Sequence, residues 1–373
     1  MVELIVGLDR RRFEPTVICL EAGGAHEATL QAANVPIEVL GYEGFRIFRH
    51  PLRTLGQLAR LVRLLRRHRP QIVHAQLFWA YVIGAYAARV ARVPWVLASR
   101  VGLSRFRSSL PRHWLRLERG ATARCDLLVA VSEGVRRDTI ASEGVPDDKV
   151  VVVYYGIDTA PFSSARPAPR ESLAAGTGPV VLTLANLIHY KGHTYLLDAW
   201  KRVNGRFPDA TLLLVGEGPM RPALEQRVSE LGLARSVRLL GSQSAVAEIL
   251  AACDLLVHPS LEEGFCNAIL EAMAAGKAVV ATDVGGNAEA VQDGVTGLVV
   301  PAADSDALAS AMESLLGDPG RRERYGTAGR ARVEKHFRMD VMVKRFEVFY
   351  EALVSGGPAA ARNALRDLAP DRI

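Results

Sequence analysis

Residues 258–276 read HPSLEEGFCNAILEAMAAG and join a short strand to a helix. The β-type run at 255–257 ends at a Pro-containing triplet, and the apolar stretch after the loop has helical spacing, with Gly276 near its end. A strand, a Gly-containing loop and a helix in this order form a crevice at the carboxyl end of a parallel strand. Glu263 in the loop and Glu271 in the helix are placed to reach the hydroxyl groups of one polar ligand.

These two carboxylates admit two interpretations. A pair of carboxylates suits a ligand rich in hydrogen-bond donors, such as a sugar or a ribose. Alternatively, the first acidic residue is favoured by the dipole at a helix N-terminus and the second is simply solvated. The spacing by itself leaves both open.

Length and composition predict a globular protein of two α/β domains. A chain of 373 residues exceeds one ordinary core, and its 49% hydrophobic and 23% charged residues are ordinary for a soluble protein. It has no uninterrupted apolar run of about 18 residues and no basic region followed by an apolar signal core, so we expect a cytoplasmic protein. The cysteines are widely separated, which predicts core residues in a reducing compartment rather than a disulfide or zinc framework: Cys19, Cys125, Cys253 and Cys266.

The first half of the chain is the basic half. Residues 1–170 contain 25 Lys and Arg against 15 Asp and Glu, within a sequence pI near 9.3. Residues 58–70 place leucines at helical spacing beside arginines, and residues 104–120 mix arginines with Phe106 and Trp114. One interpretation is a surface for anionic lipid at the inner face of the plasma membrane; the other is a solvated arginine-rich helix face. We expect no nucleic acid partner, because no recognition motif accompanies the charge.

Strands and helices alternate along the whole chain, which predicts parallel sheets with right-handed crossovers. After an opening helix tail at 1–9, a first domain over 1–165 has strands at 15–20, 35–40, 71–75, 94–99 and 126–132, with a long polar loop before the last. A Pro-, Ser-, Ala- and Gly-rich linker at 161–179 leads to a second domain over 178–337. Amphipathic helices fill 320–354, and we expect 355–373 to be frayed.

Three segments, in order and spacing, resemble the nucleotide-sugar domain of family 4 glycosyltransferases. They are KGHTYLLDAW, LLVGEGP and EEGFCNAILEAMAAGKAVVATDVGGNAEAVQDGVTGLVV. The resemblance covers roughly residues 10–350 and is specific because the Glu-x7-Glu loop, the Lys-Gly loop and the GG-x-x-E segment occur together. It implies an α/β GT-B fold, with two Rossmann-like doubly wound domains facing a cleft and a C-terminal helix at about 338–356 completing the first.

The resemblance also implies roles for the residues at the crevice. Lys191 would lie near the donor diphosphate and, with amides at helix N-termini, offset the charge that develops on the leaving group. Glu271 would bind the ribose hydroxyls. Glu263 would hold the transferred sugar together with three backbone amides, those of Gly264, Phe265 and Cys266.

Three further residues at the crevice keep two interpretations each. Glu217 and Gly218 line the same edge in the family pattern, or they form a plain turn at a strand end. Glu289 contacts the donor or caps a helix, and the cap is the interpretation we favour.

Two positions depart from the family pattern. The family has an arginine five residues before the lysine, where this chain has Asn186, so one cation on the diphosphate is missing. The family's His-x-His after a first-domain strand reads His74-Ala75-Gln76 here, and Gln76 is able to bind a sugar hydroxyl without titrating. His74 either substitutes in part for the missing histidine or is a satisfied histidine at a strand end.

A third departure concerns the start of the chain. In the family a first strand and a glycine-rich loop precede the segment that begins here at Met1. We therefore expect the first domain to lack that strand and loop, and a longer upstream reading frame to encode them.

The sequence thus predicts a metal-independent retaining glycosyltransferase without a cofactor. It would move a sugar from a nucleoside-diphosphate sugar to a polysaccharide, glycolipid or small-molecule acceptor by a substrate-assisted route. The main alternative is a catalytically weakened nucleotide-sugar-binding protein, since Asn186 and Gln76 both remove chemistry. Phosphorylase-like and epimerase enzymes share the fold, but the Glu-x7-Glu loop favours transfer. The base, the sugar and the acceptor are not fixed by the sequence.

Overall fold

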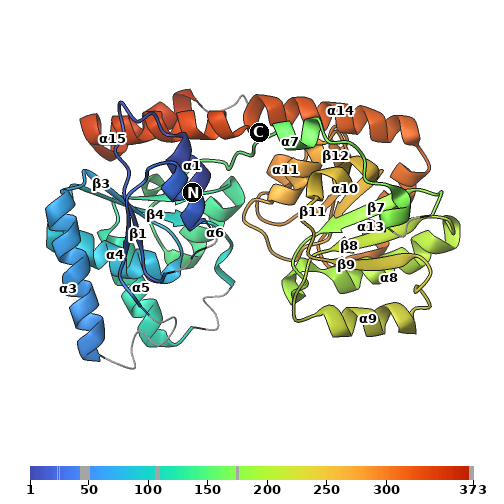
Figure 1. Ribbon diagram of the computed structural model, residues 1–373, viewed down its shortest axis with the longest axis horizontal. Helices are drawn as coiled ribbons and strands as arrows, with labels where there is room; N and C mark the ends of the chain where they lie inside the picture. Colours follow the sequence, from blue (N-terminus) through green and yellow to red (C-terminus); the bar gives the residue numbers. More distant parts are fainter. Residues whose placement is uncertain (23, 25, 43–50, 106–109, 174–175, 369–373) are drawn as a thin grey trace. The chain divides into compact units, whose positions relative to one another are not determined.

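A computed structural model describes residues 1–22, 24, 26–42, 51–105, 110–173 and 176–368, which form two compact α/β units. The first unit contains residues 1–131 and 135–154 and the C-terminal segment from Met339 onward. The second contains residues 132–134 and 155–338. Both units are built from parallel strands joined by helices (Figure 1).

The second unit has one parallel sheet whose strand order is β12-β11-β10-β7-β8-β9. Its strands are β7 (Val180–Leu184), β8 (Thr211–Val215), β9 (Val237–Gly241), β10 (Leu255–His258), β11 (Ala278–Thr282) and β12 (Gly297–Val300). The order runs outward from β7 in one direction for β8 and β9, and from β10 in the other direction for β11 and β12. This is the doubly wound arrangement that the sequence predicts.

Helices cover both faces of this sheet, because successive residues of β7, β8, β10 and β11 point to opposite faces and nearly all are buried. The pairs α8–α13 and α11–α14 pack together. The helices of this unit are α7 (Ala160–Ser163), α8 (His193–Arg206), α9 (Arg221–Glu230), α10 (Val246–Ala252), α11 (Asn267–Ala274), α12 (Asn287–Ala290), α13 (Ser305–Leu316) and α14 (Pro319–His336), with short 3₁₀ turns η4 (Arg170–Leu173) and η5 (His189–Lys191).

The described part of the first unit has two parallel sheets. One pairs β1 (Val17–Cys19) with β2 (Ile37–Val39), and the other has the order β3-β4-β5-β6, formed by Ile72–Ala75, Trp95–Arg100, Leu127–Ala130 and Val150–Val152. The connecting helices are α1 (Val2–Gly7), α2 (Glu27–Ala32), α3 (Pro51–His68), α4 (Phe78–Ala91), α5 (Arg112–Arg124) and α6 (Glu133–Glu143), with the 3₁₀ turn η3 (Asp147–Lys149) before β6.

Two expectations about secondary structure are wrong. The polar loop predicted before β5 contains α5, a helix whose inward side carries Glu118, Ala121 and Thr122, so its apolar periodicity is weak in the sequence. The segment predicted to fray from 355 is helical instead: α15 (Met339–Asp367) continues to Asp367 and is interrupted by the non-helical backbone of Gly357 before Pro358. Gly357 has φ +72°, which a glycine adopts at little cost, so the helix resumes after the break.

The segment that reads as a linker is part of the second unit. The first unit stops at Tyr154, earlier than the boundary at residue 165 that composition indicates. Residues 160–163 form α7, which packs against α10 and α11, and Leu173 in η4 is buried. A stretch rich in Pro and Ser therefore lies along the surface of a folded domain.

Among the described residues, no helix combines the length and the apolar character needed to cross a membrane. The four cysteines are free thiols, and Cys125, Cys253 and Cys266 are buried.

Candidate active site

The candidate site lies in the second unit, where the chain reverses its winding direction. Strands β7 and β10 are neighbours in the sheet, yet their following connections lead to opposite edges. Loops that leave the carboxyl ends of such a pair diverge and leave a crevice, the usual ligand site of doubly wound sheets. The loop after β7 carries Asn186 and Lys191, and the loop after β10 carries Glu263.

A glycine allows these two loops to approach each other. Gly192 has φ +69°, and a Cβ at this position would overlap the backbone oxygen of Pro259. Only glycine has both the freedom for this φ and the space for this contact. The Lys-Gly pair therefore places the lysine at the loop that contains Glu263.

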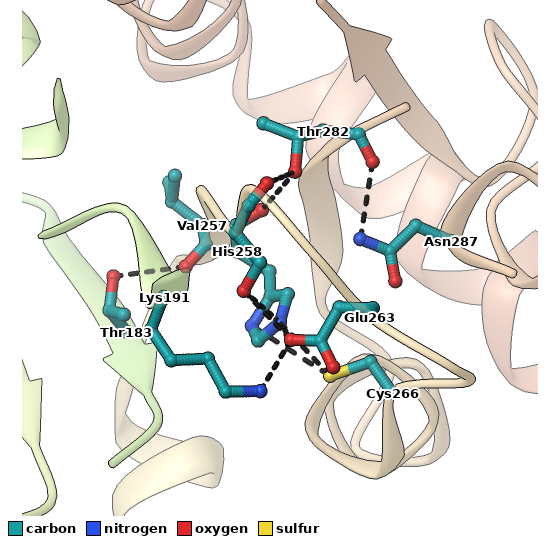
Figure 2. Close-up of polar contacts among 9 residues, drawn as sticks. Thr183, Lys191, Val257, His258, Glu263, Cys266, Thr282 and Asn287 are labelled. Carbon is teal, nitrogen blue, oxygen red and sulfur yellow. Dashed lines mark hydrogen bonds and ion pairs between the residues drawn. The ribbon is translucent and has the colours of Figure 1, made fainter. Parts of the chain in front are cut away.

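Lys191 and Glu263 form an ion pair at the centre of the site (Figure 2). Lys191 Nζ lies 2.5 Å from Glu263 Oε1, and the two side chains are 16% and 9% exposed. The same carboxylate oxygen lies 2.6 Å from His258 Nε2 and accepts a hydrogen bond of 2.7 Å from Ser260 Oγ. Glu263 is thus held on three sides in a fixed orientation.

The close contacts change the charge states of this cluster. Burial disfavours a charged Glu263, but the hydrogen bond and charge of His258 and the charge of Lys191 lower the pKa of Glu263 to about 2. Burial likewise disfavours a charged His258, yet Cys266 and Glu263 raise the pKa of His258 to about 9. Glu263 is therefore an anion, and His258 a cation, near neutral pH.

Hydrogen bonds to the backbone keep the loop in place. Thr183 Oγ1 donates to Val257 O at 2.9 Å, which ties β7 to β10. Thr282 Oγ1, at the end of β11, donates to Ser260 O at 2.5 Å, and Asn287 Nδ2 donates to Thr282 O at 3.1 Å (Figure 2). All of these side chains are buried, so each hydrogen bond pairs a donor and a backbone oxygen that water does not reach.

Glu271 lies in α11 on the same connection as Glu263. Its side chain is half-buried, and burial raises the pKa of its carboxyl group. No hydrogen bond or ion pair joins this side chain to another described residue. Glu271 is thus available to hydroxyl donors from a ligand, whereas Glu263 is already engaged by protein groups.

The residues between Glu263 and α11 are mainly packed against protein. Gly264 O accepts hydrogen bonds from Gly286 N at 3.0 Å and from Ser132 Oγ at 2.9 Å. Phe265 is buried, with its ring centroid 5.3 Å from that of Phe337. Cys266 is the N-cap residue of α11, so the first N–H groups of this helix point toward the loop.

The GG-x-x-E segment supports the loop that carries Glu263. Gly285 has φ +54°, and a Cβ there would overlap the backbone oxygen of Glu263, so the first connection after β11 packs directly on it. Glu289 accepts hydrogen bonds from the N–H groups of Glu133 at 2.8 Å and Gly134 at 2.7 Å, residues of the same unit. Glu289 thus pairs two backbone donors of its own unit, which agrees with the capping interpretation.

The remaining predicted residues of this unit lie at the edge of the site. Glu217 is exposed and forms an ion pair with Arg221, with 2.5 Å between Oε1 and Nη1. Its backbone oxygen accepts a hydrogen bond from Leu187 N, and Gly218 packs against Leu187 as well, so this turn supports the loop after β7. Asn186 is exposed in that loop.

His74 and Gln76 belong to the first unit, at the end of β3. His74 Nδ1 lies 2.7 Å from the Tyr350 hydroxyl, and its Nε2 lies 2.9 Å from Ser99 Oγ. Gln76 Nε2 donates to Ser99 Oγ at 2.5 Å and lies 3.2 Å from His74 Nε2. Burial lowers the pKa of His74 to about 3, so the ring is neutral near pH 7. Both ring nitrogens have protein partners.

Sequence reasoning missed three polar residues of the cluster around Glu263. His258 and Ser260 contact its carboxylate directly, and the signal was the His-Pro-Ser triplet directly after the strand, which we treated only as a strand terminator. His193 follows Gly192 and is buried, and burial together with the charges of His258 and Lys191 lowers its pKa to about 4.

Comparisons with known proteins agree with this fold. A model of the family described as Glycosyl transferases group 1 matches residues 165–332, and one described as Glycosyltransferase Family 4 matches residues 1–161. The crystal structure of Anabaena Alr3699/HepE in complex with UDP superposes with a TM-score of 0.81 at 24% identity, covering 94% of this chain and 96% of that chain.

Two proteins of Mycolicibacterium smegmatis are similar in sequence. The chain is 36% identical over 298 residues to an alpha-maltose-1-phosphate synthase, covering 71% of this chain and 75% of that protein. It is 33% identical over 354 residues to a GDP-mannose-dependent alpha-(1-6)-phosphatidylinositol monomannoside mannosyltransferase, covering 88% of each.

The parallel sheets, the site at the switch point and the structural similarity define a protein with the GT-B glycosyltransferase fold. Within that class, the chain belongs to the group 1 glycosyl transferases of glycosyltransferase family 4, which confirms the resemblance seen in the sequence.

Proposed function

We propose that this protein transfers a sugar, with retention of configuration, from a nucleoside-diphosphate sugar to a polysaccharide, glycolipid or small-molecule acceptor. The observation that carries the proposal is the pairing of Lys191 with Glu263 at the switch point between β7 and β10. An ammonium group held beside a carboxylate in a largely buried crevice is arranged to receive a diphosphate on one side and sugar hydroxyls on the other. In the absence of the donor the two side chains neutralise each other, and the bound donor would separate them.

Four side chains of the second unit have a proposed role in that reaction. Lys191 offsets the negative charge that grows on the departing diphosphate, and this cation allows transfer without a metal ion. Glu271, with its unpaired carboxyl group, binds the ribose hydroxyls, and Glu263 with the nearby backbone amides holds the sugar. Asn186 contributes an uncharged hydrogen bond to the phosphates, which is weaker than the family's arginine.

In this proposal the protein supplies no covalent nucleophile. A leaving phosphate oxygen accepts the acceptor's proton while the bond to the sugar breaks, so the new bond forms on the same face. The base of the nucleotide is left to experiment, because the similar mannosyltransferase is GDP-mannose-dependent while Alr3699/HepE was crystallised with UDP.

The experiment is a release assay over a panel of UDP- and GDP-sugars. Release of nucleoside diphosphate that is lost in Lys191→Ala and Glu263→Gln, and retained in the exposed control Lys201→Ala, supports transfer. Nuclear magnetic resonance of the product then reports the anomeric configuration. Tight binding of a donor with no turnover for any acceptor would instead identify a nucleotide-sugar-binding protein, the alternative that Asn186 and Gln76 favour.

We also propose that the protein acts in the cytoplasm and binds peripherally to anionic lipid at the inner face of the plasma membrane. Helix α3 turns Leu61 and Leu65 inward against α4 and leaves Arg60, Arg63 and Arg67 exposed. Because Leu61 and Leu65 are already buried, α3 would attract anionic headgroups mainly by charge rather than by inserting these leucines.

Cosedimentation with vesicles tests the membrane proposal. Binding to phosphatidylglycerol vesicles should exceed binding to phosphatidylcholine vesicles and should fall with salt. The double variant Arg63→Glu/Arg67→Glu should reduce it, while Arg235→Glu/Arg324→Glu, the same charge change on exposed residues of the second unit, should not. Equal binding to both vesicle types would contradict the proposal.

A further inference from the structure

The cluster around Glu263 has a second chemical property that sugar transfer does not use. His258, Glu263 and Cys266 each direct one potential metal-ligand atom into the same space, and these atoms lie within 4.8 Å of one another. Cys266 Sγ is 3.3 Å from His258 Nε2, which is 2.6 Å from Glu263 Oε1 (Figure 2). Within the described part of the chain, this is the single group of three such side chains that comes so close.

We propose that His258, Glu263 and Cys266 form a binding site for a thiophilic divalent cation, with Zn²⁺ as the best-matched ion. Tetrahedral Zn²⁺ with bonds of about 2.0–2.3 Å places its ligand atoms roughly 3.3–3.6 Å apart. The Cys266–His258 separation has this value already, and the His258–Glu263 pair has to open by less than about 1 Å. A thiolate, an imidazole and a carboxylate with one open position is a donor set that Zn²⁺ accepts.

The protein surroundings favour this set of ligands. All three residues lie within nine consecutive positions, on the loop whose backbone Thr282 holds, so binding requires no assembly of distant segments. His258 is 1% and Cys266 is 6% exposed, which keeps water from competing for the ligand atoms. Ser260 Oγ donates a hydrogen bond of 2.7 Å to Glu263 Oε1 and so orients the carboxylate.

Lys191 and the protons of the cluster oppose the cation. Lys191 Nζ is bonded to the carboxylate that the cation needs, and the charges of His258 and Lys191 also act on the buried His193 nearby. Binding therefore requires that the thiol and the imidazolium release their protons to solvent and that Lys191 moves aside. Occupancy would move Lys191 away from the position in which it would meet the diphosphate, so we infer that the cation inhibits donor binding; this second part rests on the proposed function, while the binding itself does not.

The direct test is titration of the metal-free protein with Co²⁺, which reports a thiolate ligand as a charge-transfer absorption band. The band should appear in the wild-type protein and disappear on addition of Zn²⁺. Cys266→Ser should abolish the band. His258→Gln should weaken the affinity for Co²⁺ by at least about 100-fold, since loss of a group that only hydrogen-bonds to a metal ligand already weakens metal affinity by about 10–100-fold. Cys253→Ser is the matched control, because Cys253 is also buried and its thiol donates to Leu250 O.

A variant that is expected to bind Co²⁺ more tightly is needed as well, because misfolding of a variant could abolish binding but could not strengthen it. Lys191→Ala removes the competing ammonium group and should increase the affinity for Co²⁺. Absence of the band in the wild-type protein, or a band that survives Cys266→Ser, would overturn the proposal. So would unchanged or weaker Co²⁺ binding in a folded Lys191→Ala protein.

A second measurement separates this inference from the proposed function. UDP and GDP binding are measured with and without Zn²⁺, and Cys266→Ser at the same Zn²⁺ concentration corrects for chelation of the ion by the diphosphate. Weaker binding with Zn²⁺ in the wild type alone supports inhibition, and equal binding in both overturns inhibition. If the Co²⁺ band appears but neither nucleotide binds to the metal-free protein, the proposed function fails and the cation site stands.

Discussion

Lys191 Nζ lies 2.5 Å from Glu263 Oε1, although 72 positions separate the two residues and they follow different strands. We expect Lys191→Ala to lower the rate of transfer by about 100- to 1,000-fold, because the loss of one group that stabilises transition-state charge typically has this effect. Steady-state kinetics with the best donor of the panel provides the measurement. Stability should change little, since Glu263 keeps His258 as a partner.

Lys201→Ala is the control for that variant, since Lys201 is an exposed lysine of α8. A Lys191→Ala protein that is folded and as active as Lys201→Ala would show that the ammonium group has no role in the reaction.

The His258–Glu263 pair predicts a bell-shaped dependence of stability on pH. The pKa of Glu263 is lowered from 4.5 to about 2, so its contribution is complete above about pH 4.5 and is lost as the pH falls through about 2. The pKa of His258 is raised from 6.5 to about 9, so its contribution is complete below about pH 6.5 and is lost as the pH rises through about 9. The pair should stabilise the second unit most between these limits.

Urea denaturation at about pH 6 and about pH 9.5 measures this effect. The wild-type protein should lose on the order of 2 kcal/mol of its unfolding free energy over this interval relative to Glu263→Gln, in which the pair is absent. The two residues share one interaction, so their contributions are not added. Parallel pH profiles for the two proteins would contradict the assignment of charge.

Asn186→Arg offers a test by gain of function. Asn186 is exposed in the loop after β7, at the position where the family pattern has a second cation. An arginine there should tighten binding of the nucleoside diphosphate by about tenfold, because a charged, bidentate donor binds phosphate more strongly than an amide. Calorimetry with UDP and GDP measures the change.

The control for the added charge is Gln226→Arg, at an exposed position of α9. An equal gain in affinity for the nucleoside diphosphate in both variants would show that the added net charge alone causes it. No gain in Asn186→Arg would show that residue 186 does not contact the diphosphate.

His74 is expected to act as a structural residue. Tyr350→Phe removes the hydroxyl that contacts His74 Nδ1 and leaves a buried ring nitrogen unpaired, which should cost about 1–3 kcal/mol of unfolding free energy. Tyr86→Phe is the matched control, since the Tyr86 hydroxyl donates to Leu117 O at 3.3 Å at an exposed position.

Activity per folded molecule should survive the change in Tyr350→Phe, and the pH profile of turnover should contain no ionisation of His74 between about pH 5 and 8, because its pKa lies near 3. A loss of turnover in His74→Asn that greatly exceeds its loss of stability would assign the ring to catalysis instead.

Much of the fold could be predicted because the local signals agree with it. The strands at 237–241 and 255–257 are short apolar runs next to turn residues, and the structure has β9 and β10 there. Helix α5 was missed because arginines occupy its exposed side and Glu118 and Thr122 its buried side, so no apolar stripe marks it. The arginine-rich composition that predicts a basic surface therefore also hides the helical periodicity of α5 in the sequence.

By itself, the sequence determined the alternation of strands and helices, the family, and the order Lys191, Glu263, Glu271 along the chain, because periodicity and motif spacing are local properties. Only the tertiary structure decided which of these groups are engaged. The neighbouring positions of β7 and β10 bring Lys191 to Glu263, and burial of the loop makes His258, Ser260 and Cys266 part of the same cluster. Such contacts depend on strand order and on the exclusion of water, which no stretch of sequence encodes locally.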